Sequence, residues 1–561
     1  MHPEVEAFYN GTSFGCHRLL GARPAGRGWR FTVWAPHARR VQVLGDWNGW
    51  DLYTAAELAA CEDGLWRGTV PAAAEGQLYK YNLLGPDGVW RMRPDLFARD
   101  GEALPGTASR LTLPPAPPPR RGALGRPVRL YELYAAGWRR HWDGRYYTGE
   151  ELGRALAPYL LENGYTDVEL MPLAEYPYDG SWGYQGCGYF CPSARIGGPR
   201  GMAALVGALH RAGIGVWMDF VPVHFAPDAG RIAEWDGAPM LEAGPSDWGS
   251  LRFDLASGPV RSFLQSAAAF WLEEMGCDGL RVDAVGHALQ GPGGRAAAGF
   301  FAGLTDGLHR RCPGVLLAAE DTAGLAGVTQ PAAAGGLGFD AVWDTGWTRD
   351  ALACLSAPPG SGAGRDAFAR LCGGRWRSDA ILPLSHDDTA GPSLWQRLAG
   401  SGDAQRAARL LYLLQYTRPG RPLNFMGNEF GCPAPFTPFR EPDWAAAAAP
   451  PHRDLAAFCR ALNALHAAHP ALRDPGSGFV PLRQDPDARL LAYERQAGAD
   501  RLVVACNLGG ADARLPVAAG GAGRGRLVFA AGPVPEGDLP VTDGRLAIRL
   551  PPFCGAVYQL T

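Results

Sequence analysis

The sequence predicts an α/β fold, a (β/α)8 TIM barrel flanked by an N-terminal and a C-terminal β-sandwich. Three observations carry this prediction: short strand-like segments punctuated by Gly and Pro come first, apolar strands then alternate with amphipathic helices, and strand-like segments return at the end. At 561 residues the chain is too long for one hydrophobic core. We therefore expect domains at 1–118, 119–455 and 456–561.

Charge and cysteine usage argue against several classes of protein. The formal charge of −3, from 53 basic and 56 acidic residues, gives no electrostatic case for nucleic acid or an anionic membrane as partner. The N-terminus lacks a basic segment followed by an apolar run, and no apolar stretch is long enough to span a bilayer. The 12 cysteines are scattered without zinc-ligand spacing and are expected to be reduced thiols. We expect a cytoplasmic monomer.

The first 118 residues are expected to be all β, with strands at 29–34, 41–44 and 78–82 and a turn at 85–88. This order resembles the glycogen- and starch-binding β-sandwich that precedes many α-glucan enzymes. The resemblance implies a carbohydrate site at Trp50, Lys80 and Trp90, where rings stack on glucose and the ammonium meets hydroxyls. Lys80 is the only lysine in the chain. The alternative is that Trp50 and Trp90 only pack the sandwich or dock it on its neighbour.

The middle of the chain alternates strands and helices, the pattern of a parallel barrel. After a Pro/Arg/Gly-rich linker at 114–127, strands are expected at 128–134, 167–171, 216–220, 279–283, 315–320, 340–343, 380–384 and 422–426. Helices are expected at 149–163, 201–213 and 260–275. A helix at 453–469 and strands such as 489–493 and 501–505 then begin the C-terminal sandwich.

Charged and imidazole side chains gather where these strands end, and barrel enzymes place their reacting groups at the carboxyl ends of the strands. The strand ends carry Asp219 with His224, Arg281 with Asp283, Glu320 with Asp321, and His386 with Asp387. Arg281 and Asp283 alternate with apolar residues, so both side chains lie on one face of their strand. A fixed positive charge keeps a carboxylate ionised, as a nucleophile requires. A structural ion pair would explain one such motif alone, but not four together.

At these positions the sequence resembles the α-amylase superfamily, whose four ordered regions match 219–225, 279–285, 317–321 and 382–387. Within it the chain is most similar to the 1,4-α-glucan (glycogen) branching enzymes, as 164–172, 179–185, 335–340 and 425–430 also indicate. The resemblance implies a retaining double displacement on α-glucan such as amylose or glycogen. Asp283 would be the nucleophile, Glu320 the general acid and base, and Asp387 a stabiliser of the transition state. No metal or organic cofactor is required.

The resemblance also implies roles for residues around these three acids. His224 and His386 would donate hydrogen bonds to the reacting sugar, and Arg281 would hold Asp283 oriented and charged. Tyr184 would stack under the sugar, and Asp179 would bind a nearby hydroxyl. Asp219 is interpreted as a structural anchor for Arg281 rather than a reactant.

Three segments depart from the branching-enzyme pattern. The segment 286–299 is shorter than the tyrosine- and lysine-rich loop expected there, and 388–392 and 432–444 lack the usual residues. A hydrolase of the same superfamily, of trehalose-releasing or debranching type, and a catalytically silent glucan-binding protein are therefore the competing hypotheses. Incubation with amylose separates them, because branching lowers iodine staining without creating reducing ends.

Overall fold

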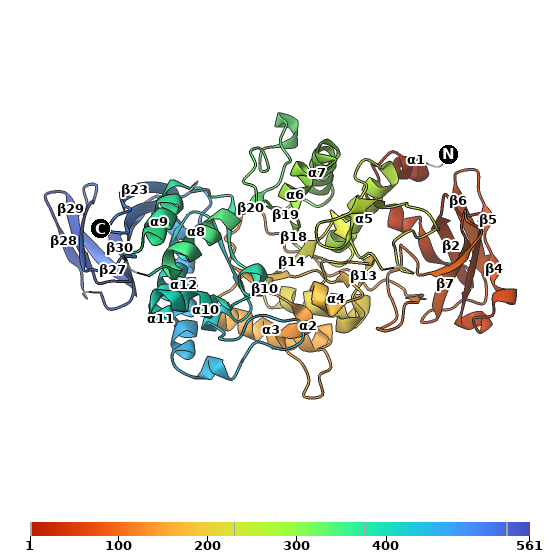
Figure 1. Cartoon of the computed structure of the whole chain (residues 1–561), viewed down its shortest axis with the longest axis horizontal. Helices are drawn as coiled ribbons and strands as arrows, with labels where there is room; N and C mark the ends of the chain where they lie inside the picture. The colour runs from red at the N-terminus through yellow and green to blue at the C-terminus, as the bar shows by residue number, and fades with distance from the viewer. Residues whose placement is uncertain (1–2, 229, 359, 375, 535–536) are drawn as a thin grey trace. The chain divides into compact units, whose positions relative to one another are not determined.

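The computed structural model describes residues 3–228, 230–358, 360–374, 376–534 and 537–561. Eight parallel strands form a closed barrel in the order β10-β11-β14-β18-β19-β20-β21-β22, which confirms the predicted fold class (Figure 1). They are β10 (Leu130–Leu133), β11 (Asp167–Leu170), β14 (Gly215–Phe220), β18 (Gly279–Val282), β19 (Leu316–Glu320), β20 (Ala341–Trp343), β21 (Ala380–Leu384) and β22 (Arg421–Phe425).

The chain divides into two compact units, and each is described by itself. The first contains residues 1–124, 134–158 and 169–340, and the second contains residues 125–133, 159–168 and 341–561. The domain boundaries expected at 118 and 455 stay a prediction.

The N-terminal part of the first unit holds two antiparallel sheets, ordered β1-β2-β6-β5 and β4-β3-β7-β8, with β9 paired to β7. Their strands are β1 (Gly21–Ala25), β2 (Gly28–Trp34), β3 (Arg40–Gly45), β4 (Ala56–Glu57), β5 (Ala59–Ala60), β6 (Leu65–Val70), β7 (Leu78–Leu84), β8 (Trp90–Arg93) and β9 (Ser109–Arg110). Buried Phe31 lies edge-on to Tyr79 and Tyr81, with ring centroids 5.4 and 6.2 Å apart. Aromatic packing of this kind fills the space between the sheets.

An N-terminal helix, α1 (Pro3–Tyr9), was not predicted in the segment expected to be all β. The segment that follows it is bound to helix α5 (Gly258–Glu273): the Ser13 amide donates to Ser262 Oγ at 3.2 Å, and the Cys16 amide donates to Ser266 Oγ at 3.1 Å. Buried Val5 and Phe8 supply the apolar face of α1. This helix therefore depends on tertiary packing, since a helix of two turns is unstable alone.

The barrel strands of the first unit bring the predicted site residues into register. In β14 and β18 Asp219 pairs with Arg281, and in β18 and β19 Arg281 pairs with Ala318. Besides α1 and α5, the helices of this unit are α2 (Ala135–Trp138), α4 (Gly198–Arg211), α6 (Val285–Gln290) and α7 (Gly294–Arg311), and α3 (Gly149–Asn163) continues into the second unit. Both sides of these strands are buried, so polar residues in them must find partners.

Two small sheets interrupt the barrel and were not predicted. One pairs β12 (Ala174–Glu175) with β13 (Gly188–Pro192), and the other has the order β15-β17-β16, from β15 (His224–Phe225), β17 (Leu251–Phe253) and β16 (Glu242–Pro245). The short segment 286–299 forms α6 and the start of α7.

The second unit contains β10, β20, β21 and β22, and β10 pairs with β22 so that Glu132 lies opposite Phe425. Its helices are α8 (Thr345–Ser356), α9 (Gly362–Gly373), α10 (Leu394–Leu398), α11 (Ala404–Thr417), α12 (His452–Ala468) and α13 (Pro470–Arg473). Leucine-rich faces of α11 and α12 share a core with the C-terminal strands, including Leu491, Val504 and Val557.

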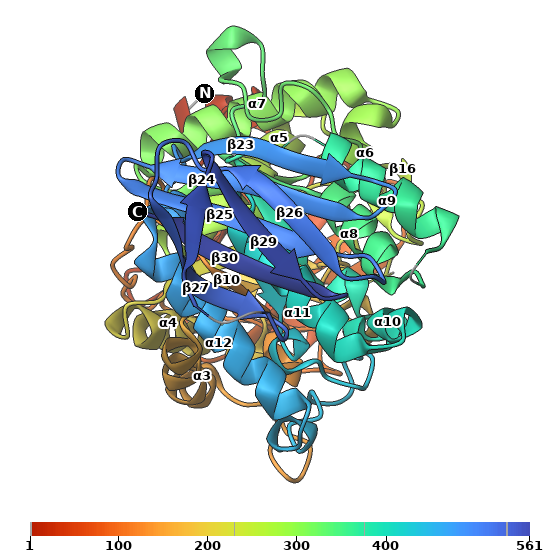
Figure 2. The same cartoon turned by 90° about the vertical axis from the view of Figure 1, so that its left-hand side faces the viewer.

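The C-terminal strands form one folded antiparallel sheet in the order β23-β24-β25-β30-β27-β28-β29-β26 (Figure 2). They are β23 (Gly478–Asp485), β24 (Leu490–Ala497), β25 (Asp500–Asn507), β26 (Ala513–Ala518), β27 (Arg524–Ala531), β28 (Leu539–Thr542), β29 (Arg545–Leu550) and β30 (Cys554–Leu560). Val503 and Tyr558 on one layer share a core with Leu515 and Ile548 on the other. The predicted sandwich is therefore present.

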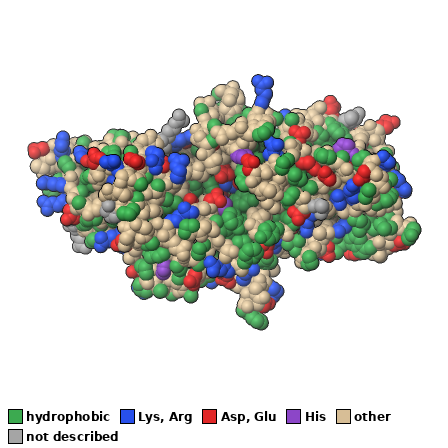
Figure 3. All heavy atoms as spheres, viewed as in Figure 1, with side chains coloured by type: hydrophobic (Ala, Val, Ile, Leu, Met, Phe, Trp, Pro, Cys, Tyr) green, Lys and Arg blue, Asp and Glu red, His purple; other side chains and the backbone are tan. Residues whose placement is uncertain are grey.

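On the face shown in Figure 3, basic and acidic side chains are interspersed, as the small net charge of −3 suggests. Among the described residues, no helix is long and apolar enough to cross a membrane.

Candidate active site

The first unit gathers its charged groups around one buried guanidinium. Arg281, which is 1% exposed, places Nη1 2.7 Å from Asp283 Oδ1 and 2.8 Å from both carboxylate oxygens of Asp219. Its Nη2 lies 3.0 Å from Glu320 Oε2. The contact predicted between Arg281 and Asp283 is confirmed, and so is the anchoring of Arg281 by Asp219.

One positive charge shared among three carboxyl groups sets their ionisation. Burial alone would raise the pKa of Asp283, but Arg281, His224 and hydrogen bonding to Glu320 bring it below its usual range. Burial raises the pKa of Asp219, and the charge of Arg281 only partly offsets that effect. Burial would also lower the pKa of Arg281, but the carboxylates around it raise it well above its usual value. Asp283 is thus the carboxylate that this site keeps charged.

A strained turn directly after Asp283 fixes the position of Glu320. Ala284 has φ of 53°, in the left-handed region that residues with a side chain rarely adopt. In this conformation its backbone N–H donates to Glu320 Oε2 at 2.8 Å. The Asp283 amide donates to the carbonyl of Phe220 at 2.9 Å, which ties the turn to strand β14. The backbone therefore positions both acids before any substrate binds.

His224 completes this cluster and is oriented by a residue that sequence reasoning missed. Its Nε2 lies 3.5 Å from Asp283 Oδ2, and its Nδ1 lies 3.0 Å from the hydroxyl of buried Ser250. The ring of Trp248, 44% exposed, lies 4.8 Å from the His224 ring. Ser250 and Trp248 come from the β16–β17 hairpin, and no strand-end position pointed to either.

Tyr184 and Asp179, two further predicted residues of this unit, are hydrogen-bonded to protein side chains. The Tyr184 hydroxyl donates to Asp219 Oδ2 at 2.5 Å, which makes this tyrosine part of the arginine network. Asp179 accepts from Tyr146 Oη at 2.7 Å and from Arg195 Nε at 2.8 Å. The roles predicted for both toward a sugar stay predictions.

The second unit holds the remaining histidine and acid of the prediction, at the end of β21. His386 Nδ1 lies 2.5 Å from Glu132 Oε1, and the His386 amide donates to Glu132 Oε2 at 3.0 Å. Glu132 is fully buried, whereas the Asp387 side chain is 62% exposed and lies 3.5 Å from His386 Nε2. Burial, with the charge of Asp387, raises the pKa of Asp388 to about 6. Glu132 was missed, although its place at the end of the first barrel strand could have revealed it.

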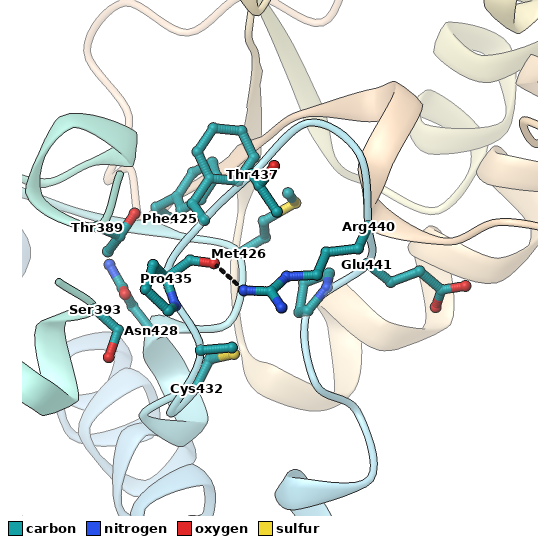
Figure 4. Close-up of a pocket in the computed structure, with 13 residues that line it drawn as sticks. Thr389, Ser393, Phe425, Met426, Asn428, Cys432, Pro435, Thr437, Arg440 and Glu441 are labelled. Carbon is teal, nitrogen blue, oxygen red and sulfur yellow. Dashed lines mark hydrogen bonds between the residues drawn. The ribbon is translucent and has the colours of Figure 1, made fainter. Parts of the chain in front are cut away.

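The segment 432–444, one of the departures from the expected pattern, covers part of this strand end. The Phe436 amide donates to the carbonyl of Thr389 at 2.9 Å, and the ring of Phe436 packs edge-on against Phe425 at 4.8 Å. The segment lines a cavity of about 20 Å³. Figure 4 shows the segment curving around it, with Arg440 Nη2 donating to the carbonyl of Pro435 at 3.2 Å. Such a volume admits a water molecule but no sugar.

In the N-terminal sandwich, the three predicted carbohydrate contacts are spread along one sheet. Lys80 pairs with Leu44 near the end of β3. The turn that leads to Trp50 starts at that same end. Trp90 pairs with Leu84, four residues farther along β7 and so roughly 13 Å away. Trp50 donates from Nε1 to Asp46 Oδ1 at 2.8 Å, Lys80 donates to Thr107 Oγ1 at 2.5 Å, and Arg40 covers Trp90 at 5.5 Å.

Metal binding has no candidate in the part of the chain that the structure describes, since no three His, Cys, Asp or Glu side chains there form a group that could hold an ion. Arg281 occupies the space between the acids of the first unit.

Comparison with known proteins adds three findings. Residues 14–98 match the carbohydrate-binding module 48 family (isoamylase N-terminal domain). The chain is 37% identical over 533 residues to the 1,4-alpha-glucan branching enzyme GlgB of Leifsonia xyli subsp. xyli, covering 86% of this chain and 71% of that protein. It is also 37% identical over 495 residues to GlgB of Bacillus caldolyticus, covering 82% and 74%.

Solved structures show the same fold at lower identity. A putative alpha amylase from Salmonella typhimurium has a TM-score of 0.75 at 20% identity, covering 97% of this chain and 99% of that one. Apo pullulanase from Paenibacillus barengoltzii has a TM-score of 0.77 at 19% identity, covering 100% and 96%. At such identities the likeness concerns the fold alone.

Proposed function

The chain belongs to the GlgB family of 1,4-α-glucan branching enzymes, and on that premise we propose that it cleaves α-1,4 glucosidic bonds and transfers the released chain to a glucan 6-hydroxyl, forming α-1,6 branches. The observation that carries the proposal is the cluster of Asp283, Glu320 and His224 around Arg281. A charged carboxylate, a second acid beside it and an oriented imidazole are what a retaining transglycosylase needs.

In the first step, Asp283 attacks the anomeric carbon of the donor glucan. The bond to the leaving 4-oxygen breaks while Glu320 donates its proton to that oxygen, which leaves a covalent glycosyl-enzyme. Asp283, whose pKa is lowered, is assigned as the charged carboxylate of the pair and Glu320 as the proton donor. His224 Nε2, beside Asp283, donates to the sugar.

In the second step, Glu320 takes the proton of a glucan 6-hydroxyl, whose oxygen attacks the anomeric carbon and releases Asp283. Carboxyl groups that work through a covalent intermediate lie about 5–5.5 Å apart, closer than a pair that must admit a water molecule between them. Asp283 and Glu320 both bind the guanidinium of Arg281, which supports the closer arrangement. We assign Asp387 to the binding of sugar hydroxyls and stabilisation of the transition state, and His386, oriented by Glu132, to hydrogen bonding with the sugar.

The test is incubation with amylose. A branching enzyme lowers iodine staining and creates α-1,6 linkages without new reducing ends, whereas the competing hydrolase creates reducing ends and a silent glucan-binding protein does neither. The Glu320→Gln variant keeps an acceptor for the Ala284 amide but cannot donate a carboxyl proton, and we expect at least a hundredfold loss of activity. Wild-type rates in that variant would exclude Glu320 as the acid.

The N-terminal module is assigned to binding of α-glucan through Trp50, Lys80 and Trp90. Because Trp50 and Lys80 lie at one end of the sheet and Trp90 at the other, replacing Trp50 and Trp90 singly with Ala should weaken adsorption to glycogen by different factors. Equal adsorption of the wild type and both variants would show that these rings pack the sandwich and do not bind glucan. We further assign the protein to the cytoplasm as a monomer, without nucleic-acid or membrane partners, which size-exclusion chromatography and cell fractionation test.

A further inference from the structure

Glu132 holds both the ring and the backbone of His386. Its Oε1 lies 2.5 Å from His386 Nδ1, and its Oε2 accepts from the His386 amide at 3.0 Å. The glutamate is itself fixed in the barrel, because its carbonyl accepts from the Met426 amide at 3.0 Å at the end of β22. One carboxylate that binds both groups of the same residue holds the imidazole in one orientation.

The pair is removed from water, and this limits how many protons it can lose. Glu132 is 0% exposed and His386 is 2% exposed, with the apolar ring of Phe425 edge-on at 6.2 Å. When both ring nitrogens carry a proton, the imidazolium balances the carboxylate and the pair is neutral as a whole. Loss of one proton would leave an unbalanced buried charge, which is costly. The amide that donates to Oε2 favours the ionised carboxylate, so both protons belong to the ring.

The charged groups around the imidazole favour the same state. Asp387 and Asp388 follow it in the turn η7 (His386–Asp388), and Asp387 Oδ1 lies 3.5 Å from His386 Nε2. The pKa of Asp388 is about 6, so this acid is charged at pH 7 and above. The positive charge that acts on Asp388 comes from Arg397. Two acids that follow the ring directly outweigh this one arginine and favour the imidazolium.

The protonation of the ring decides what His386 can offer a sugar. An imidazolium has a donor at each nitrogen, so Nδ1–H serves Glu132 and Nε2–H is available to a sugar oxygen. A neutral ring whose Nδ1–H is held by a carboxylate would instead present a lone pair at Nε2. Donation from His386 to the reacting sugar therefore requires the doubly protonated ring.

We propose that Glu132 is a positioning residue that keeps His386 doubly protonated, so that Nε2 stays a hydrogen-bond donor to the glucan between about pH 6 and 8. This inference deepens the proposed function and rests on it for the identity of the ligand. Glu132 is buried and acts only through His386. A charged donor forms a stronger hydrogen bond than a neutral one, which gives the buried carboxylate its value to the site.

Nitrogen NMR of protein labelled with 15N-histidine detects this proton directly, because ring nitrogens with and without a proton differ in chemical shift. The signals of His386 are those that disappear in His386→Gln. We expect both ring nitrogens to be protonated at pH 7 in the wild type. In Glu132→Gln a neutral amide replaces the carboxylate, and the ring should lose its second proton where an ordinary histidine does, around pH 6.5. An unprotonated Nε2 at pH 7 in the wild type would overturn the proposal.

Calorimetric binding of maltohexaose tests what the proton does for the ligand. The Glu320→Gln protein is the parent, because it lacks the proton of the general acid and its titration. Adding Glu132→Gln should leave the affinity within about threefold of the parent at pH 5.5 and lower it about tenfold at pH 8. If Glu132 only supported the fold, the affinity would fall by the same factor at both pH values, which would contradict the proposal.

Two further variants control for the loss of a buried carboxylate. Glu132→Asp keeps the charge, so its affinity relative to the parent should be the same at pH 5.5 and pH 8. Glu429→Gln is the matched control, since Glu429 is another buried carboxylate of the second unit but binds the hydroxyls of Tyr131 and Tyr159. Its affinity relative to the parent should not change with pH. Thermal unfolding verifies that each variant is folded, and the NMR of the wild type needs no variant of Glu132.

Failure of the proposed function is distinguishable from failure of this inference. The NMR experiment reads the ring of His386 in the protein alone, whereas branching of amylose by the wild type is measured separately. If the wild type does not branch but both nitrogens of His386 are protonated at pH 7, the function is wrong and the effect of Glu132 on the ring stands. If the wild type branches with an unprotonated Nε2, the function stands and the inference is wrong.

Discussion

Replacing Arg281 with Gln should move the pH dependence of the enzyme as well as its rate. The change removes the charge that lies 2.7–3.0 Å from Asp219, Asp283 and Glu320. Two buried carboxyl groups and the partly buried Glu320 are left to share protons. An adjacent arginine lowers the pKa of an aspartate by roughly 1–3 units, so the pKa of Asp283 should rise by about that amount. Loss of one partner of a buried ion pair also costs about 3–5 kcal/mol of stability.

The assay is the rate of amylose branching measured between pH 4 and 8, with thermal unfolding recorded at each pH. The acid limb of kcat/KM, which reports ionisation of the nucleophile in the free enzyme, should shift upward by roughly 1–3 units in Arg281→Gln. Arg154→Gln is the control, because Arg154 and its partner Glu150 are both more than 70% exposed and should leave the profile unchanged.

A second variant guards against misfolding of Arg281→Gln. Because burial raises the pKa of Asp219 to about 6, this residue carries little charge at the acid end of the profile. Asp219→Asn leaves Arg281 to Asp283 and Glu320, so the acid limb should not move to higher pH. If both variants kept the wild-type limb, or if both shifted in the same direction, Arg281 would not control the ionisation of Asp283.

Three further predictions concern positioning and stability. Ser250→Ala removes the partner of His224 Nδ1 and should lower kcat by roughly tenfold with little change in KM; an unchanged kcat would show that His224 is held without it. Burial lowers the pKa of His17 to about 4 from 6.5, so the unfolded state binds more protons between these values and stability falls by about 3 kcal/mol as pH drops through them. His17→Gln should flatten this slope in thermal unfolding, and an equally steep slope would assign it to other groups. Glu429→Leu leaves two tyrosine hydroxyls and a backbone amide without their buried acceptor and should cost about 3 kcal/mol by denaturant unfolding, whereas a neutral result would mean that these groups find other partners.

The barrel could be predicted because its strands are continuous apolar runs and because amphipathic helices follow them at regular intervals. Helix α3 was predicted with both ends correct at 149 and 163, and β21 at 380 and 384. The elements that were missed are short or depend on distant partners. Helix α1 is bound to α5, more than 240 residues away in sequence, and strands of two or three residues such as β15 and β17 carry no periodicity to detect.

For the site, the charged ends of consecutive strands sufficed to find Asp283, Arg281 and Glu320, since residues at strand ends are placed by the barrel itself. Ser250 could not be found in this way, because it reaches His224 from a hairpin whose register is set by pairing with β15. Likewise the turn at Ala284 is visible only in its backbone angle, since alanine carries no signal for the left-handed conformation.

The sequence by itself determined which side chains are candidates for reaction, because the order of the strands and the two-residue spacing of Arg281 and Asp283 are local properties of the chain. Only the tertiary structure decided how those groups are charged, since the ionisation of a buried carboxyl depends on every charge within a few ångströms, whatever its distance along the chain.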